Sequence, residues 1–346
     1  MKIHGPFAVV AALLLFAGCG GQGSGEEKAQ KPAAPAEKAV EDPLLFEKQG
    51  TKGLRMLEIT IDGYPNADYG GLFLGDRLGY FADVGLQLHV HTPIEPRRPV
   101  LYVVGKVVEL GVSHQPEVAL ARARGTPIVA VGSWLPRPTT SLIWLPGSGI
   151  HGIADLKGKT IATEGLEYQE RFLEAILSRA NLSLDDVTVI RPKYLMIPSL
   201  KGGRADAAIG GSWNVEGIQL RSEGLHPVVL PVTKLGIPDY EELVLIARED
   251  QLGKGKDMIE SFISALARGN RAALAHPAAA ARAIEAASES HGERAAKGTA
   301  ATLPMLSKNN RMDEARWQSF GAWMEAEGLL ESAPPPSQLL TNAYVP

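Results

Sequence analysis

Cysteine is almost absent from this chain of 346 residues, because Cys19 is the only one. A single cysteine excludes an intrachain disulfide, a cysteine-based zinc site and a cysteine redox pair. Concentrated positive charge is lacking as well, since the formal net charge is −4 and the lysines and arginines are scattered. Nucleic-acid phosphates require clustered cations. We therefore expect no nucleic-acid partner.

Long apolar runs are confined to the first residues, where Phe7 to Phe16 follows a mildly basic start and leads into Ala17-Gly18-Cys19. This run is too short to span a bilayer comfortably and is typical of a signal peptide. The small residues before the cysteine predict a lipoprotein signal over residues 1–18 with lipidation of Cys19. An ordinary signal peptide or an uncleaved signal anchor are the alternatives.

Residues 19–52 are rich in Gly, Ala, Pro, Glu and Lys and contain too little apolar surface to fold. We expect them to form a flexible tether. The folded part is then expected outside the cytoplasm, in the cell envelope, anchored to a membrane by lipid and facing the periplasm or the exterior.

Catalytic motifs are lacking too. No glycine-rich segment lies between a predicted strand and a following helix, where a phosphate-binding loop would be. There is neither a Gly-x-Ser-x-Gly elbow nor a His-Glu-x-x-His pattern. Glu241 and Glu242 are adjacent, so on a strand they point to opposite faces and cannot act as a dyad. His89 and His91 share one strand face and are a candidate metal pair, but we favour a solvated face. We expect no metal site, no cofactor and no catalysis.

From Leu54 onward, short β-branched runs alternate with amphipathic helical stretches, which predicts an α/β fold with largely parallel sheets covered by helices. About 300 residues exceed what one compact core normally holds, so we expect two lobes. The last part of the chain is predicted to be almost wholly helical and to pack back on the first lobe. Two crossings between the lobes predict a hinge. The expected division is 53–138 plus 246–346 for lobe 1 and 139–245 for lobe 2.

Aromatic and amide-rich segments follow several predicted strands, and ligands of open α/β folds bind at such strand ends. Trp213, flanked by Gly210-Gly211 and by Asn214, offers a flat wall beside an amide and a carboxylate. The alternatives to ligand binding are structural roles, with Asn66 and Asp68 as helix caps and Trp213 as part of the core. The residues expected to bind the ligand are Tyr64, Asn66, Tyr69, Ser113, Gln115, Trp213, Asn214, Glu216, Tyr240 and Glu242.

In these segments the sequence resembles the ABC-importer binding proteins for thiamine pyrimidine precursors, a family related to the eukaryotic enzyme that makes this pyrimidine. The likeness runs from about Leu57 to about Ala275. The motifs that carry it, in this order and spacing, are Pro65-Asn66 with Gly71-Leu72, Gly79-Tyr80-Phe81 with Gly85-Leu86, Gly111-Val112-Ser113 with Gln115-Pro116-Glu117, Asp155-Leu156-Lys157-Gly158-Lys159, Trp213-Asn214 with Glu216-Gly217-Ile218, and Pro238-Asp239-Tyr240 with Glu242-Leu243.

The resemblance implies the two-lobed, type II periplasmic-binding-protein fold, with a hinge, a cleft and a pyrimidine stacked between aromatic rings. Asn66, Trp213, Asn214, Glu216, Tyr240 and Glu242 match the family pattern. Two positions depart from it, because the family commonly has Trp where Gly63 stands and often His where Tyr69 stands.

The resemblance also implies a function in transport and thiamine biosynthesis. We expect a monomeric, lipid-anchored substrate-binding protein of an ABC transporter, working with a permease and an ATPase. Its ligand is expected to be a hydroxymethylpyrimidine or formylaminopyrimidine. A flavin-like ligand, an alkanesulfonate and a pyrimidine synthase activity are the alternatives, although the related synthase carries a cysteine-rich motif that this chain lacks.

Overall fold

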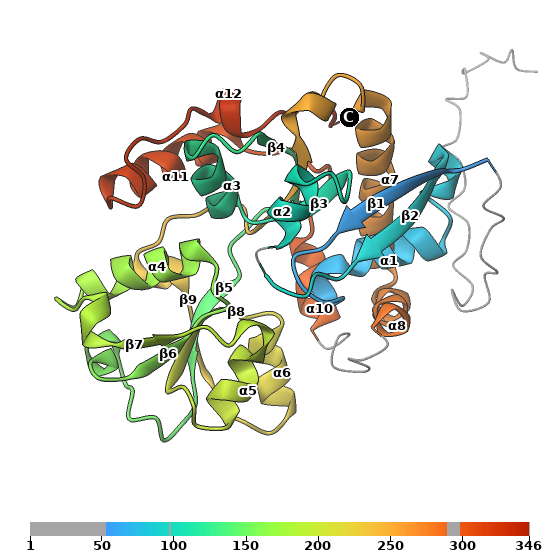
Figure 1. Ribbon diagram of the computed structural model, residues 1–346. Coiled ribbons are helices and arrows are strands. Elements are labelled where there is room, and N and C mark those ends of the chain that lie inside the picture. The colour runs from blue at the N-terminus through green and yellow to red at the C-terminus, as the bar shows by residue number, and fades with distance from the viewer. Residues whose placement is uncertain (1–52, 97, 289–297, 346) are drawn as a thin grey trace, which may run out of the picture. The chain divides into compact units, whose positions relative to one another are not determined.

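The computed structural model describes residues 53–96, 98–288 and 298–345, shown as a ribbon in Figure 1. The predicted signal peptide, the tether and Cys19 lie outside the described residues. Two five-stranded sheets form the framework, which confirms the predicted α/β class. The prediction of largely parallel sheets is wrong, because each sheet has two parallel and two antiparallel strand pairs. Within the described part of the chain, none of the helices combines the length and the apolar character needed to cross a membrane.

The first sheet has the strand order β2-β1-β3-β10-β4, with β1 parallel to β2 and β3, and β10 antiparallel to β3 and β4. All eight residues of β4 are buried, in keeping with its apolar sequence. The strands of this sheet are β1 (Arg55–Thr60), β2 (Leu86–His91), β3 (Leu110–Ser113), β4 (Ile128–Leu135) and β10 (Leu243–Arg248). The helices of this lobe are α1 (Gly70–Arg77), α2 (Arg98–Val104), α3 (Gln115–Ala123), α7 (Lys256–Ala275), α8 (Pro277–Ala287) and α10 (Thr299–Thr302).

The second sheet has the order β7-β6-β8-β5-β9, and its inner strands again combine parallel and antiparallel pairs. Its strands are β5 (Thr140–Trp144), β6 (Thr160–Ala162), β7 (Thr188–Ile190), β8 (Ala207–Ser212) and β9 (Val228–Pro231). Its helices are α4 (Glu167–Ser178), α5 (Met196–Lys201) and α6 (Glu216–Ser222). The 3₁₀ turns of the two lobes are Ala67–Tyr69, Ala82–Val84, Ile153–Leu156, Leu184–Asp186, Lys193–Leu195, Val232–Leu235, Glu249–Gln251 and Leu303–Met305.

The chain passes between the two sheets from β4 to β5 and returns just before β10. The predicted boundary between 245 and 246 falls inside β10, which pairs over its whole length with strands of the first sheet. The return crossing therefore ends before Leu243, three residues earlier than the predicted boundary. An apolar run reveals that a strand is buried but not which sheet it joins.

The helical tail packs on both lobes. Helix α7 lies so close to α1 that a Cβ atom on Gly269 would approach the carbonyl oxygen of Gly71 to 2.2 Å. Further on, α11 (Glu314–Ala326) places Trp317 in a cluster of first-lobe residues and Phe320 in the core cluster of the second lobe. Helix α12 (Pro336–Leu339) returns to β4 of the first sheet through a bridge between Leu340 and Ala130. The tail was predicted to pack on the first lobe; α11 instead packs on both lobes.

Candidate functional site

A small cavity of about 50 Å³ lies between residues of the two sheets. Its walls come from segments that follow β1, β3, β6 and β8 and from the turn after β7, the strand ends at which ligands of such folds bind. An adjoining pocket of about 230 Å³ shares Tyr64, Glu164, Tyr194 and Glu216 with it. The residues that line the small cavity are Asp62, Gly63, Tyr64, Asn66, Asp68, His114, Glu164, Leu166, Tyr194, Gly210, Ser212, Val215 and Glu216.

Tyr64 and Glu216 face each other across this cavity. The Tyr64 hydroxyl donates a hydrogen bond to Oε1 of Glu216 over 3.2 Å, and Oε2 of Glu216 accepts one from the backbone N–H of Ser212 over 2.7 Å. Glu216 is the first residue of α6, so its position follows from the turn that leaves β8. Burial raises the pKa of the Glu216 carboxyl, although these hydrogen bonds oppose the shift. The pair contributes one polar group from each lobe.

Asp62 is held from behind the cavity wall by Tyr69, whose hydroxyl donates to Oδ1 of Asp62. Tyr69 is fully buried, and its ring centroid lies 5.4 Å from that of Trp134. On the cavity side, Nε2 of His114 lies 3.7 Å from Oδ2 of Asp62. Tyr69 therefore positions Asp62 and does not itself line the cavity. The pKa of Asp62 is raised, chiefly by burial.

Asp68 and Asn214 join the two lobes beside the cavity. Nδ2 of Asn214 donates to Oδ1 of Asp68 over 2.7 Å and to Oγ1 of Thr302 over 2.9 Å. Burial, followed by the charge of Asp62, raises the pKa of Asp68 well above its usual range. Asn66 caps the next turn, since its Oδ1 accepts from the backbone N–H of Asp68 over 2.8 Å, and it also lines the cavity. Capping and cavity lining are thus compatible at Asn66.

Glu164 completes the acidic lining. Burial and the charge of Glu216 raise its pKa to about 8, and Gln169 holds it by accepting from its backbone N–H and donating to its Oε2. Asp62, Asp68, Glu164 and Glu216 together make the wall acidic, and its described residues include no lysine or arginine. Such a lining attracts groups that donate hydrogen bonds or carry positive charge, and it repels anions.

Glu242, Tyr240 and Gln115 secure the crossings between the lobes. Oε2 of Glu242 accepts hydrogen bonds from the backbone N–H groups of Thr139 and Thr140, over 2.5 and 2.8 Å, and from the hydroxyl of Tyr240 over 3.1 Å. Oε1 of Gln115 accepts from the backbone N–H of Glu241 over 2.7 Å. All three side chains are buried and lie outside the cavity lining. These three residues lie at the hinge between the lobes.

Trp213 and Ser113 stand apart from the main cavity. Trp213 is half-buried and absent from the lining, while its backbone N–H donates to the carbonyl of Thr139 over 3.0 Å. Ser113 lines a hollow of about 10 Å³ that shares Asp62 and His114 with the cavity. The structure therefore brings together Tyr64, Asn66 and Glu216 of the predicted binding residues, and places the others behind the wall, at the hinge or beside it.

The polar lining residues outside the predicted binding set are Asp62, Asp68, His114, Glu164, Tyr194 and Ser212. Glu164 lies two residues after the end of β6 and precedes Gly165, whose φ of +86° marks a tight turn. This strand end could have been recognised in the same way as the others. Tyr194 lies in the 3₁₀ turn after β7, and its hydroxyl donates to the backbone carbonyl of Asp62 over 3.3 Å. Nothing in its sequence context indicated that role. Tyr194 and Tyr64 supply the phenol rings of the described lining, beside the imidazole of His114.

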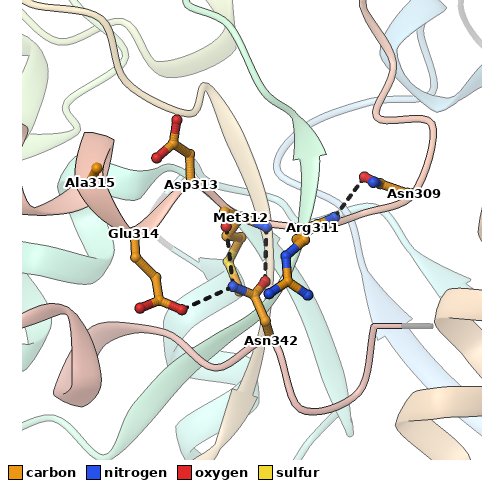
Figure 2. Close-up of a pocket in the computed structure, with 7 residues that line it drawn as sticks. All are labelled: Asn309, Arg311, Met312, Asp313, Glu314, Ala315 and Asn342. Atoms are coloured by element: carbon orange, nitrogen blue, oxygen red, sulfur yellow. Dashed lines mark hydrogen bonds between the residues drawn. The ribbon is translucent and has the colours of Figure 1, made fainter.

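A larger hollow of about 490 Å³ lies near the C-terminus, around Asn342 (Figure 2). Oδ1 of Asn342 accepts from the backbone N–H of Met312 over 2.9 Å, and its Nδ2 donates to the carbonyl of Met312 over 3.1 Å and to Glu314 over 3.4 Å. These contacts fasten the last loop to the start of α11. The side chains of Asn309, Asp313, Glu314 and Asn342 thus bind other parts of the chain, so the interlobe cavity is the better candidate for a ligand site.

Comparison with known proteins identifies the family of the chain. Residues 66–280 match the family described as NMT1/THI5 like. A Haemophilus influenzae protein named as a thiamine biosynthesis protein is 29% identical over 80% of this chain and 88% of its own length. The formylaminopyrimidine-binding protein of Halalkalibacterium halodurans is 30% identical over 63% of this chain and 66% of its own length. A Schizosaccharomyces pombe 4-amino-5-hydroxymethyl-2-methylpyrimidine phosphate synthase is 28% identical over 56% of this chain and 59% of its own length.

Among solved structures, the alkanesulfonate-binding protein SsuA of Xanthomonas axonopodis pv. citri, bound to MOPS, superposes with a TM-score of 0.67. The match covers 83% of this chain and 98% of that protein at 16% identity, so it bears on the fold alone. The described lobes therefore have the two-lobed fold of periplasmic binding proteins, as the sequence resemblance predicted.

Proposed function

Because this chain belongs to the NMT1/THI5-like family, we propose that it is a solute-binding protein that captures a thiamine pyrimidine precursor, of the hydroxymethylpyrimidine or formylaminopyrimidine type. The observation that carries the proposal is the buried acidic lining between the lobes, centred on Glu216 and Tyr64. The formylaminopyrimidine-binding relative supports the choice of ligand.

The chemistry of an aminopyrimidine fits this lining. Its exocyclic amino group donates hydrogen bonds, and its ring nitrogens are weakly basic, so carboxyl groups are suitable partners in either protonation state. In the proposal, Glu216 and Glu164 accept from the amino edge of the ring. Tyr64 and Tyr194 supply aromatic faces, a role that the sequence had assigned to Trp213 together with Tyr69 or Tyr64. Asn66 offers a further amide at the rim.

The cavity of about 50 Å³ is much smaller than a typical ligand pocket of roughly 300 Å³ or more. In the proposal the two lobes therefore separate to admit the ligand and close again around it. Glu242 and Gln115 hold the crossings about which this motion turns. Asn214 and Asp68, which join the lobes by a hydrogen bond of 2.7 Å, would part in the open state.

The alternative ligands fit less well. An alkanesulfonate is an anion, and the lining gathers Asp62, Asp68, Glu164 and Glu216 without a lysine or arginine among its described residues. A flavin would require the lobes to stay much further apart than a pyrimidine does, because the cavity and its side pocket measure about 50 and 230 Å³. We further propose that the protein binds its ligand without converting it, since the sole cysteine cannot supply the cysteine-rich motif of the related synthases.

The cellular setting belongs to the same proposal. The protein is held in the cell envelope by a lipid on Cys19, faces the periplasm or the exterior as a monomer, and delivers its ligand to an ABC permease with its ATPase. The similarity to periplasmic binding proteins supports this setting, and the run from Phe7 to Cys19 supports the anchor.

Calorimetric titration of the chain with an aminopyrimidine, riboflavin and an alkanesulfonate tests the proposal. We expect the aminopyrimidine alone to bind, and Glu216→Gln to weaken it by roughly tenfold or more, because a buried hydrogen bond to a charged group is worth about 1.5–3 kcal/mol. Glu174→Gln, on the exposed side of α4, is the matched control and should leave affinity unchanged. Binding of the sulfonate without the pyrimidine, or equal affinity in Glu216→Gln, would refute the assignment.

A further inference from the structure

A second cluster of ligand-type side chains lies on the first sheet, away from the interlobe cavity. Glu58 on β1 is in register with His89 on the neighbouring parallel strand β2, and His91 follows two residues later. Because side chains alternate along a strand, these three project from the same face. Leu88 and Val90, between and beside the histidines, pack on the opposite side against the core of the lobe.

The three side chains converge on one oxygen atom. Oε2 of Glu58 lies 2.7 Å from Nδ1 of His89 and 2.5 Å from Nε2 of His91. The two imidazole rings lie 4.6 Å apart, centroid to centroid. One nitrogen from each ring and one carboxylate oxygen thus lie within 4.8 Å of one another. Two imidazoles and a carboxylate are the ligand types that divalent first-row transition metals prefer.

We propose that Glu58, His89 and His91 form a three-ligand site for a divalent transition-metal ion of the zinc class. Tetrahedral zinc places its ligands about 2.0–2.2 Å from the ion, which separates them from each other by about 3.3 Å. The present contacts of 2.5 and 2.7 Å are shorter, so the Glu58 carboxylate must withdraw by less than about 1 Å. A side-chain torsion can supply that movement.

The exposure of the cluster leaves room for a fourth ligand. The side chains of His89, His91 and Glu58 are 59%, 29% and 30% exposed, so water or a ligand from a partner can complete the coordination. The site also connects two strands. Strand β2 ends the described order of the first sheet, and a metal shared by Glu58 and the histidines would fasten this edge to β1.

The competing explanation is a carboxylate that accepts hydrogen bonds from both rings on a solvated face, the interpretation favoured from the sequence. The sequence could not decide between them, because the third ligand comes from a strand about 30 residues away and is brought into register only by the parallel pairing. Metal titration separates the two explanations, since hydrogen bonding alone predicts no saturable binding of an ion at this place.

The test is calorimetric titration of the untagged full chain in mild detergent with Zn²⁺, followed by visible absorption with Co²⁺. A tag-free protein is required because added histidines bind the same ions. The chain with Cys19→Ser removes the only thiol and should bind equally well. We expect one ion per chain, and at least about tenfold weaker binding in each of Glu58→Gln, His89→Asn and His91→Asn.

His226→Asn, which replaces an exposed histidine elsewhere, is the matched control and should leave affinity unchanged. Because a bound ion stabilises only the folded state, Zn²⁺ should raise the unfolding temperature of the unsubstituted chain and not that of the doubly substituted His89→Asn, His91→Asn chain. Circular dichroism verifies that the variants fold. Absence of saturable binding, or binding that survives these substitutions, overturns the proposal.

Discussion

The buried carboxyl of Glu164 should make the stability of the protein fall as the pH rises from mildly acidic to mildly alkaline. Its pKa is raised from 4.5 to about 8 by burial and by the charge of Glu216. A carboxyl with a raised pKa in the folded state is protonated there over a pH range in which the unfolded chain is already ionised. The folded state then binds more protons than the unfolded state, so the free energy of unfolding decreases with pH across that range.

The perturbation that isolates this effect is Glu164→Gln, which removes the titration and keeps a side chain able to accept from Gln169. Because one pKa unit corresponds to about 1.4 kcal/mol, keeping the ionised Glu164 carboxyl buried should lower the free energy of unfolding by about 5 kcal/mol above pH 8. Between pH 5.5 and 8.5 this penalty should grow by about 3 kcal/mol. We therefore expect the stability advantage of the variant over the unsubstituted chain to grow by about 3 kcal/mol over this interval, from about 1 kcal/mol at pH 5.5.

Urea unfolding at pH 5.5, 7.0 and 8.5, followed by circular dichroism and by tryptophan fluorescence, measures this difference, provided that the two probes give coincident transitions. Comparing the variant with the unsubstituted chain at each pH cancels the titration of the groups that do not interact with Glu164. Glu174→Gln, on the exposed side of the same region, should change stability by less than about 0.5 kcal/mol at every pH. A stability difference between Glu164→Gln and the unsubstituted chain that stays constant from pH 5.5 to 8.5 would refute the reasoning.

Three further predictions concern the free energy of unfolding, measured in the same urea assay. Glu242→Ala should destabilise the protein by about 3 kcal/mol or more, because the buried N–H groups of Thr139 and Thr140 lose their acceptor; a change below about 1 kcal/mol would contradict this. Gly269→Ala should cost about 2–3 kcal/mol, since its methyl group would lie 2.2 Å from the carbonyl oxygen of Gly71, whereas Gly253→Ala, with no atom within 4 Å, should be nearly neutral. Trp134→Phe should cost about 1–3 kcal/mol by removing the donor that bonds the buried carbonyl of Asp68 over 2.9 Å, and equal stability of the two proteins would show that this bond contributes nothing.

Local pattern in the sequence was sufficient to predict the α/β class, because short β-branched runs such as those at Met56, Leu86, Ile128 and Leu243 form strands in the structure. The strand-to-helix segments at Tyr64 and Glu216 were recognisable for the same reason, because residue order along the chain controls which side chains follow a strand. The sequence pattern did not indicate helix α2 (Arg98–Val104). Its proline at the second position and its short length gave little periodic signal.

What the sequence determined by itself is the set of polar and aromatic residues available at the ends of the strands, since each such segment is local. Only the tertiary structure decided which of them meet: that Tyr64 reaches Glu216, that Tyr194 enters the wall while Trp213 stays outside it, and that Glu58 lies opposite His89. These contacts join residues that are far apart in the chain. They depend on how the sheets pair and on how the lobes pack, which no local pattern encodes.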